Sequence, residues 1–198
     1  MLFRSPPWDQ VVYWALDLET TGFDPRRDAI LSIGMIPVRG GVILYGERFY
    51  SLVRPGGHAN LDTEAIRAHH ILPGELEGAP PFAAILSGVN RRIEEGVLLL
   101  HFSGLDLGFL RSAYRAAGLS WPRPRKVDTV VLLNKLSKRD RFVDPHPVPW
   151  PTSLTGARAR IGLPPHTAHH ALADALATAE LFLALRSRLG ARKLRELL

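Results

Sequence analysis

The chain has 198 residues and no cysteine, which fits one domain with a full core and excludes disulfides, thiolate zinc sites and cysteine nucleophiles. The net charge is +6, but residues 1–100 hold 9 Lys and Arg against 12 Asp and Glu, whereas the remainder holds 16 against 7. An acidic first half and a basic second half suit a polyanionic ligand that approaches metal ions held by carboxylates.

We expect a single domain over residues 1–198, because the predicted elements are all needed for one core. Residues 1–10 would form an N-terminal extension, and the proline-rich stretch 139–151 would be a loop within the domain. The N-terminus lacks the apolar core of a signal peptide, and no run reaches the roughly 18 apolar residues of a membrane span. We therefore expect a cytoplasmic protein with no membrane partner.

The first predicted strand ends in two carboxylates. Residues 11–16 form an apolar run of the β-branched and aromatic kind, and Asp17 and Glu19 follow it with Leu18 between them. Positions two apart on a strand share a face, so both acids point the same way. Their repulsion predicts a divalent cation with hard oxygen ligands, Mg²⁺ or Mn²⁺, although two solvated acids at a strand end are the alternative. Residues 20–22 would form a turn with room for a ligand.

The later elements complete a mixed α/β pattern. In chain order we expect strands at 29–38 and 42–53, a short helix at 61–69 capped by Asn60 or Asp62, a helix at 80–95, a buried strand at 97–101, a helix at about 106–117, a short strand near 127, and helices running to 138, at 153–161 and at about 170–189. Three antiparallel strands followed by two crossover strands predict a five-stranded mixed sheet with helices on both faces.

Three further acids stand where an apolar residue would fit the pattern. Asp106 follows the buried strand at its carboxyl end, where open α/β sheets bind ligands, although it could instead cap the next helix. Asp128 is better explained as a helix cap, together with Thr129. Asp174 is the only charge in residues 171–179, a helical segment rich in alanine. Because small residues let a helix lie close to a sheet, we expect Asp174 to point into a crevice.

His169 stands five residues before Asp174. Positions five apart on a helix diverge by about 140°, so the two can share a site only if His169 lies on the preceding loop or first turn. The prolines at 164 and 165 favour a loop there. A zinc site formed with His166 and His170 is an alternative, but the cluster lacks a thiolate and a regular histidine spacing.

These residues together resemble the three motifs of the DEDDh exonucleases, the family of the proofreading epsilon subunit of bacterial DNA polymerase III, RNase T and oligoribonuclease. Asp17 and Glu19 lie in L-D-L-E-T-T-G, Asp106 in L-L-L-H-F-S-G-L-D, and His169 and Asp174 in H-H-A-L-A-D-A. The resemblance spans about residues 11–187. The second motif departs from the family's H-N-x-x-F-D, because Phe102 replaces the asparagine and Leu105 the aromatic residue, which bears on how the terminal base is held.

The resemblance implies an RNase H-like fold and stepwise hydrolysis of single-stranded or frayed DNA from its 3′ end. It implies two Mg²⁺ or Mn²⁺ ions held by the four acids, with His169 as the general base that takes a proton from the attacking water. It also implies residues that contact the substrate: Leu18, Thr20, Thr21, Gly22, His69, Phe102 and Leu105. A DNA polymerase is a candidate partner. Trimming of RNA and a non-catalytic RNase H-like binding module are the alternatives.

Overall fold

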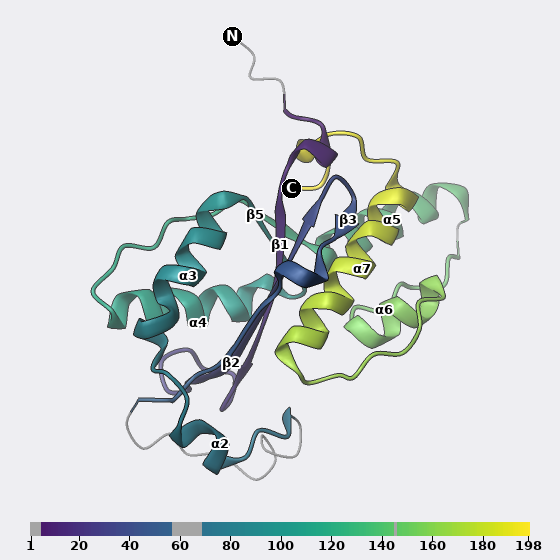
Figure 1. The fold of residues 1–198 in the computed structure, drawn as a ribbon. Helices are drawn as coiled ribbons and strands as arrows, with labels where there is room; N and C mark the ends of the chain where they lie inside the picture. Colours follow the sequence, from purple (N-terminus) through teal and green to yellow (C-terminus); the bar gives the residue numbers. More distant parts are fainter. Residues whose placement is uncertain (1–4, 57–68, 145) are drawn as a thin grey trace.

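A mixed β-sheet runs through the centre of the molecule in the computed structural model, which describes residues 5–56, 69–144 and 146–198 (Figure 1). The elements in chain order are η1 (Trp8–Gln10), β1 (Tyr13–Thr20), β2 (Ile30–Arg39), β3 (Val42–Ile43), η2 (Tyr45–Glu47), β4 (Phe49–Leu52), α2 (Pro73–Glu77), α3 (Phe82–Glu95), β5 (Val97–Leu100), α4 (Ser103–Ala116), β6 (Lys126–Asp128), α5 (Thr129–Val143), α6 (Leu154–Ile161), α7 (Ala171–Leu189) and η3 (Leu194–Glu196).

The sheet has the order β3-β2-β1-β5-β6, with β4 also paired to β2. β2 is antiparallel to β1, β3 and β4, whereas β1, β5 and β6 are parallel to one another. The predicted mixed sheet, three antiparallel strands followed by two crossover strands, is confirmed. The carboxyl ends of β1 and β5 therefore lie at one edge of the sheet, where a ligand crevice is expected.

The strand expected at 42–53 is interrupted, and this part of the prediction was wrong. β3 pairs with Val38 and Arg39 of β2, β4 pairs with residues 32–35, and η2 lies between them. Pro37 explains the break, because proline has no N–H to donate to the ladder. Its carbonyl instead accepts a hydrogen bond from the N–H of Leu44 at 2.9 Å. The two short strands together occupy the place of the expected third strand.

Helices cover both faces of the sheet: α3 and α4 lie on one side and α5, α6 and α7 on the other (Figure 1). Side chains of β1 alternate between the two cores, with Tyr13 and Ala15 facing α7 and Trp14 and Leu16 facing α3 and α4. All four residues of β5 are buried, which is typical of a parallel strand covered on both faces.

Several helix boundaries differ from the prediction. α4 begins at Ser103, so Asp106 lies inside its first turn and does not cap it. α5 continues to Val143, five residues into the loop expected at 139–151. Residues 139–143 contain no proline that would end the helix. Asp128 caps α5 as predicted, accepting a hydrogen bond from the N–H of Val130 at 2.9 Å. The helix α2 was not predicted, and the helix expected at 61–69 lies outside the described residues apart from His69.

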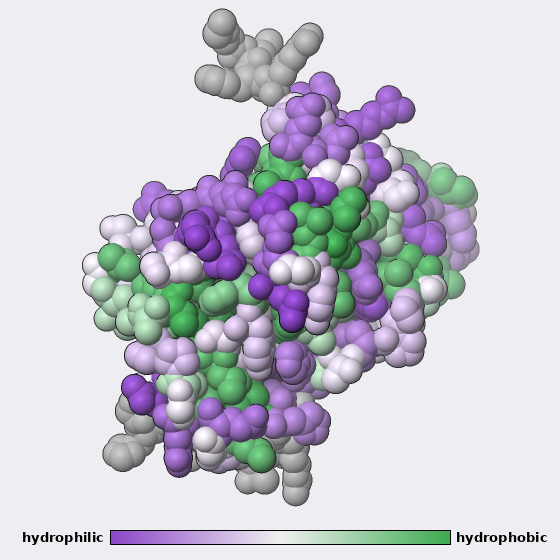
Figure 2. All heavy atoms as spheres, viewed as in Figure 1, coloured by the Kyte–Doolittle hydropathy of each residue, from purple (hydrophilic) through white to green (hydrophobic). Residues whose placement is uncertain are grey.

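The described part of the expected N-terminal extension packs against the end of the chain. Trp8 donates its backbone N–H to the carbonyl of Arg192 at 3.1 Å, and its ring meets Phe182 edge-on at 6.4 Å. On the face shown in Figure 2, hydrophilic and hydrophobic side chains are intermixed. None of the described helices combines the length and the apolar character needed to cross a membrane.

Candidate active site

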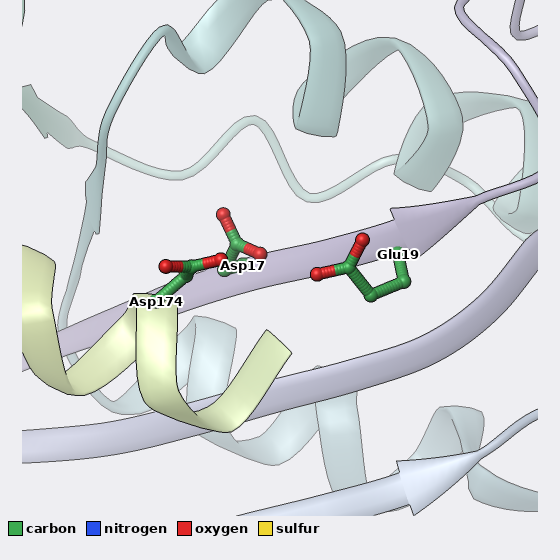
Figure 3. A group of neighbouring side chains, drawn as sticks. All are labelled: Asp17, Glu19 and Asp174. Atoms are coloured by element: carbon green, nitrogen blue, oxygen red, sulfur yellow. The ribbon is translucent and has the colours of Figure 1, made fainter. Parts of the chain in front are cut away.

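Three carboxylates converge between β1 and the start of α7. Asp17 and Glu19 project from one face of β1, and Asp174 reaches them from the first turn of α7 (Figure 3). One ligand oxygen from each of the three lies within 4.8 Å of the others. The structure therefore brings together the two strand acids and the helix acid that the sequence singled out.

A glycine on β2 lets these acids meet. Gly34 pairs with Asp17 across the β1–β2 ladder. A Cβ atom on Gly34 would lie only 2.4 Å from the carbonyl carbon of Ala171 and from the backbone nitrogen of Leu172. The first turn of α7 thus rests directly on the backbone of β2. Asp174, one turn further on, is held over β1 as the alanine-rich sequence predicted.

The end of β1 is shaped by a bulge and a tight turn. The register of the β1–β2 ladder shifts between Glu19 and Thr20, and such a bulge re-aims neighbouring side chains. The hydroxyl of Thr20 donates to the carbonyl of Gly22 at 2.7 Å, and the hydroxyl of Thr21 donates to Asp28 at 3.2 Å. A Cβ on Gly22 would collide with the Asp28 carboxylate. Both threonine hydroxyls are thus engaged in closing the turn at the mouth of the site.

Asp106 lies near the three acids but outside their cluster. It is 6% exposed, and its charge raises the pKa values of Asp17 and Glu19. Burial raises the pKa of Asp106 itself to about 7, opposed by hydrogen bonds from its own N–H and from that of Leu18. These hydrogen bonds from backbone N–H groups hold the Asp106 carboxylate at the start of α4, beside Asp17, Glu19 and Asp174.

The site carries more negative charge than its surroundings balance. Burial, followed by the charges of Asp106, Asp174 and Glu19, raises the pKa of Asp17 well above its usual value. Burial and the charges of Asp174 and Asp106 raise the pKa of Glu19 to about 8. In the described part of the chain, no Lys or Arg forms a salt bridge with any of these acids. Clustered oxygen ligands without a Lys or Arg counter-ion fit a hard divalent cation.

His169 lies outside α7, as the spacing required. Its φ angle of 62° places it in the left-handed region, and its backbone N–H donates to one oxygen of Asp174 at 2.8 Å. Its side chain is exposed. His170 is the N-cap of α7, where its Nδ1 accepts the N–H of Ala173 at 3.4 Å and its ring stacks on Tyr50 at 5.0 Å. The two adjacent histidines therefore differ in their surroundings.

His166 contacts Asp174 directly, which the sequence did not predict. Its Nε2 lies 2.8 Å from the Asp174 oxygen Oδ1, and its side chain is only 9% exposed. No spacing rule relates the two residues, because the loop between them sets the contact. The zinc alternative gains no support: within the described ranges, the one cluster of potential metal ligands holds three acids and no histidine.

A buried arginine fixes the loop that carries these histidines. Arg158 of α6 is 2% exposed and donates to the carbonyls of Ala177 at 2.8 Å and Pro164 at 3.0 Å. It also pairs with Glu180 at 2.7 Å. Arg158 thereby ties α6, α7 and the start of the loop together. The sequence offered no signal for it, because a single arginine in a short helix reads as a surface residue.

The altered second motif has an unusual backbone. Phe102 adopts φ 61° and ψ 53°, a left-handed conformation that favours glycine or asparagine. Its ring is 52% exposed and meets His101 edge-on at 5.2 Å, and Leu105 is 36% exposed. His101 itself bonds to Thr129 at 2.7 Å and to the carbonyl of Thr152 at 2.8 Å. Both substituted positions therefore present apolar side chains to solvent.

Two other predicted contact residues are more enclosed. Leu18 packs partly buried against the core on the α3 and α4 side. His69 is 5% exposed and accepts the N–H of Ile71 at 3.0 Å. Burial, followed by the charges of His70 and His169, lowers its pKa.

A cavity of about 340 Å³ opens beside the acids. It is lined by Asp17, His101, Ser153, Leu154, Thr155, His166, Ala168, His169 and Asp174. The cavity therefore joins the ends of β1 and β5, the N-terminus of α6 and the loop before α7. Its size and position allow part of a nucleotide to lie against the carboxylates.

Comparison with known proteins agrees with this geometry. A family model described as exonuclease, of the RNase T type, matches residues 14–182. The chain is 30% identical over 186 residues to a PolC-type DNA polymerase III of Thermotoga maritima, covering 92% of the chain and 12% of that protein. It is 32% identical over 191 residues to a DNA polymerase III subunit epsilon-like protein of Rhodobacter capsulatus, covering 95% and 25%. The chain spans about a quarter or less of these curated relatives.

Solved structures share the fold at low sequence identity. A complex of E. coli exonuclease I with single-stranded DNA superposes with a TM-score of 0.75 at 20% identity, covering 91% of this chain and 41% of that one. The cell-death related nuclease CRN-4 superposes with a TM-score of 0.78 at 13% identity, covering 91% and 65%. The predicted RNase H-like fold is confirmed.

Proposed function

The chain belongs to the RNase T-type exonuclease family, and from this we propose that it hydrolyses single-stranded or frayed DNA stepwise from the 3′ end with two Mg²⁺ or Mn²⁺ ions. The observation that carries the proposal is the convergence of the Asp17, Glu19 and Asp174 oxygens within 4.8 Å, with no salt bridge from a Lys or Arg of the described residues to any of them. A binding module gains nothing from such a costly cluster.

Asp17, Glu19 and Asp174 would hold the ions, with Asp106 completing the set from the start of α4. Bound divalent ions supply charge neutralisation at the phosphodiester and a water of lowered pKa. The residues themselves fix where the scissile phosphate can lie, because β1 and α7 hold the carboxylates rigidly through the Gly34 contact. Elements of regular structure hold such a site with less error than loops do.

His169 would accept the proton of the attacking water. Its imidazole is exposed at the cavity that the acids line, and a neutral imidazole nitrogen can accept a proton from water. His166 lines the same cavity, but its Nε2 is engaged by Asp174 and its side chain is nearly buried. The free ring therefore favours His169 as the base and leaves His166 to orient Asp174.

DNA is favoured as substrate because curated relatives bear the names of DNA polymerase III proteins and a structural neighbour is a complex with single-stranded DNA. The same names make a DNA polymerase the candidate partner. An RNA 3′ end is the second candidate, supported by the RNase T-type family model. The cavity of about 340 Å³ beside the acids has room for part of one nucleotide, which favours an unpaired 3′ end over a paired one.

The deciding experiment uses 5′-labelled single strands of DNA and RNA of matched sequence and a blunt DNA duplex, each with Mg²⁺, Mn²⁺ or EDTA. We expect a ladder of labelled products that shorten from the 3′ end, fastest on single-stranded DNA, and no cleavage in EDTA. Asp17→Ala should lose metal affinity and activity together. Release of the label as the first product, or full activity in EDTA, would refute the proposal. Tight DNA binding without cleavage would favour the non-catalytic module.

A further inference from the structure

A second hollow lies away from the carboxylates, between α4 and the segment that connects α4 to β6. This hollow, the basic groove, has a volume of about 780 Å³, and its lining includes four cationic side chains, Arg111, Arg115, Arg123 and Lys126. The other lining residues carry no charge, so the groove has no acidic member. A concave surface lined by one sign of charge focuses its potential and attracts the opposite charge.

The protein leaves these cations largely uncompensated. In the described ranges none of the four takes part in a salt bridge. Lys126 donates to the hydroxyl of Ser103 at 2.8 Å, and the guanidinium of Arg111 lies 6.0 Å from the ring centroid of Trp121. Arg111, Arg115 and Arg123 are otherwise exposed. Their charge is available to an external anion.

The groove begins near the start of α4, the helix that also carries Asp106. Leu107, which lines it, directly follows Asp106, and Lys126 reaches Ser103, the first residue of α4. Arg115 lies nine residues beyond Asp106 on the same helix, which is about 13 Å along the axis at 1.5 Å per residue. A helix face of that length can contact the backbone of a few consecutive nucleotides of a single strand.

One aromatic side chain, Trp121, accompanies the charges. Trp121 lines the groove and packs edge-on against Tyr114 with ring centroids 5.1 Å apart, which fixes its orientation. Leu119, also in the lining, is 53% exposed. Cations that follow a backbone together with an aromatic surface for bases are the two features of non-sequence-specific single-strand binding.

We propose that the basic groove binds the sugar-phosphate backbone of a single-stranded nucleic acid a few nucleotides upstream of its 3′ end. The proposal rests on the proposed function, because it assumes that the 3′ end lies at the carboxylates. The strand runs from the acids past the N-terminus of α4 and along the exposed arginines of this helix. A longer strand therefore binds more tightly than a dinucleotide, because only the longer strand reaches the arginines of the groove.

The test compares two triple variants with equal loss of charge. The groove variant carries Arg111→Ala, Arg115→Ala and Arg123→Ala, and leaves Lys126 in place because Lys126 bonds to α4. The control variant carries Arg141→Ala, Arg192→Ala and Arg195→Ala, three exposed arginines that line no part of the groove. Affinity for a 5′-labelled oligo(dT) of about 20 nucleotides, long enough to exceed the groove, is measured by fluorescence anisotropy in EDTA at several salt concentrations.

Each phosphate contact on a single strand contributes about 0.7 to the slope of log K against log salt, which is about fivefold in affinity at about 0.1 M salt. Loss of three contacts should therefore weaken binding by about 100-fold and reduce the slope by about 2. With Mg²⁺, KM for the long oligonucleotide should rise with kcat unchanged. Cleavage of a dinucleotide, which cannot reach the arginines, should be unchanged.

Equal binding by the groove and control variants would overturn the inference, as would an equal loss of activity on the dinucleotide and the long strand. Failure of the proposed function gives a different pattern, in which the wild-type protein cleaves neither substrate. The binding measurement in EDTA still tests the groove in that case, because it requires no catalysis.

Discussion

The close contact between Gly34 and α7 predicts that Gly34→Ala will damage the site more than it damages the fold. The added Cβ would lie 2.4 Å from backbone atoms of Ala171 and Leu172, and ordinary van der Waals contact begins at 3.4 Å. Because backbone cannot rotate away as a side chain can, the first turn of α7 must move by about 1 Å, the difference between these two distances. Asp174 would move with it, away from Asp17.

The expected magnitudes follow from this displacement. Overpacking of this kind costs about 1–3 kcal/mol, which lowers Tm by about 2–4 °C per kcal/mol in a chain of this size. A 1 Å misplacement of a catalytic group costs about 10²-fold in rate. We therefore expect kcat/KM to fall by about 100-fold at 25 °C, where the protein is still folded, together with weaker binding of Mg²⁺.

The assay pairs exonuclease kinetics with thermal unfolding followed by circular dichroism. Gly46→Ala is the first control, because a Cβ on Gly46 meets nothing within 4 Å. Ile93→Val is the second, because it removes a buried methyl group from α3 on the far face and costs about 0.5–1.5 kcal/mol without touching α7. Wild-type activity and Tm in Gly34→Ala would refute the reasoning. So would an equal loss of activity in Ile93→Val.

Three other predictions test the site. Without metal, in EDTA, the pKa of Glu19 is raised from 4.5 to about 8 by folding, so the folded protein binds more protons than the unfolded chain in this pH range. The free energy of unfolding should therefore fall as pH rises from 4.5 to about 8. Glu19→Gln should flatten this dependence of Tm on pH, and an unchanged slope of Tm against pH would contradict the prediction. His169→Ala should lower kcat by about 10²–10⁴-fold, whereas His170→Ala should leave turnover nearly intact. Equal losses of kcat in the two variants would remove His169 from its role. Phe102→Asn should relieve left-handed strain of about 1–2 kcal/mol and raise Tm by a few degrees; a lower Tm would show that the exposed ring stabilises the fold.

The sequence predicted those parts of the site that depend on local pattern. Alternation along β1 placed Asp17 and Glu19 on one face, and the alanines around Asp174 predicted a helix packed against the sheet. A five-residue separation with prolines before it predicted that His169 precedes the helix. Each of these depends on chain geometry within one element or its boundary, which periodicity reports directly.

The remaining features depend on contacts between elements. No local pattern signals that His166 folds back onto Asp174, or that Arg158 is buried by bonds to two carbonyls of other segments. Gly34 reads as an ordinary interruption in a strand until the helix above it is known. Phenylalanine at residue 102 gives no hint of a left-handed backbone, because its intrinsic preference opposes that conformation. Tertiary packing decides all four.

Both oxygens of Asp174 are already held by the protein, Oδ1 by the ring of His166 and Oδ2 by the N–H of His169. Asp174 therefore holds the loop before α7 in place, in addition to being a candidate metal ligand. A substitution at Asp174 consequently removes a candidate metal ligand and also the hydrogen bond that holds the backbone of His169. In a double-mutant cycle the two residues should be strongly non-additive, with Asp174→Ala masking the effect of His169→Ala. Loss of activity in an Asp174 variant alone thus measures how the site is assembled, and cannot be assigned to metal binding.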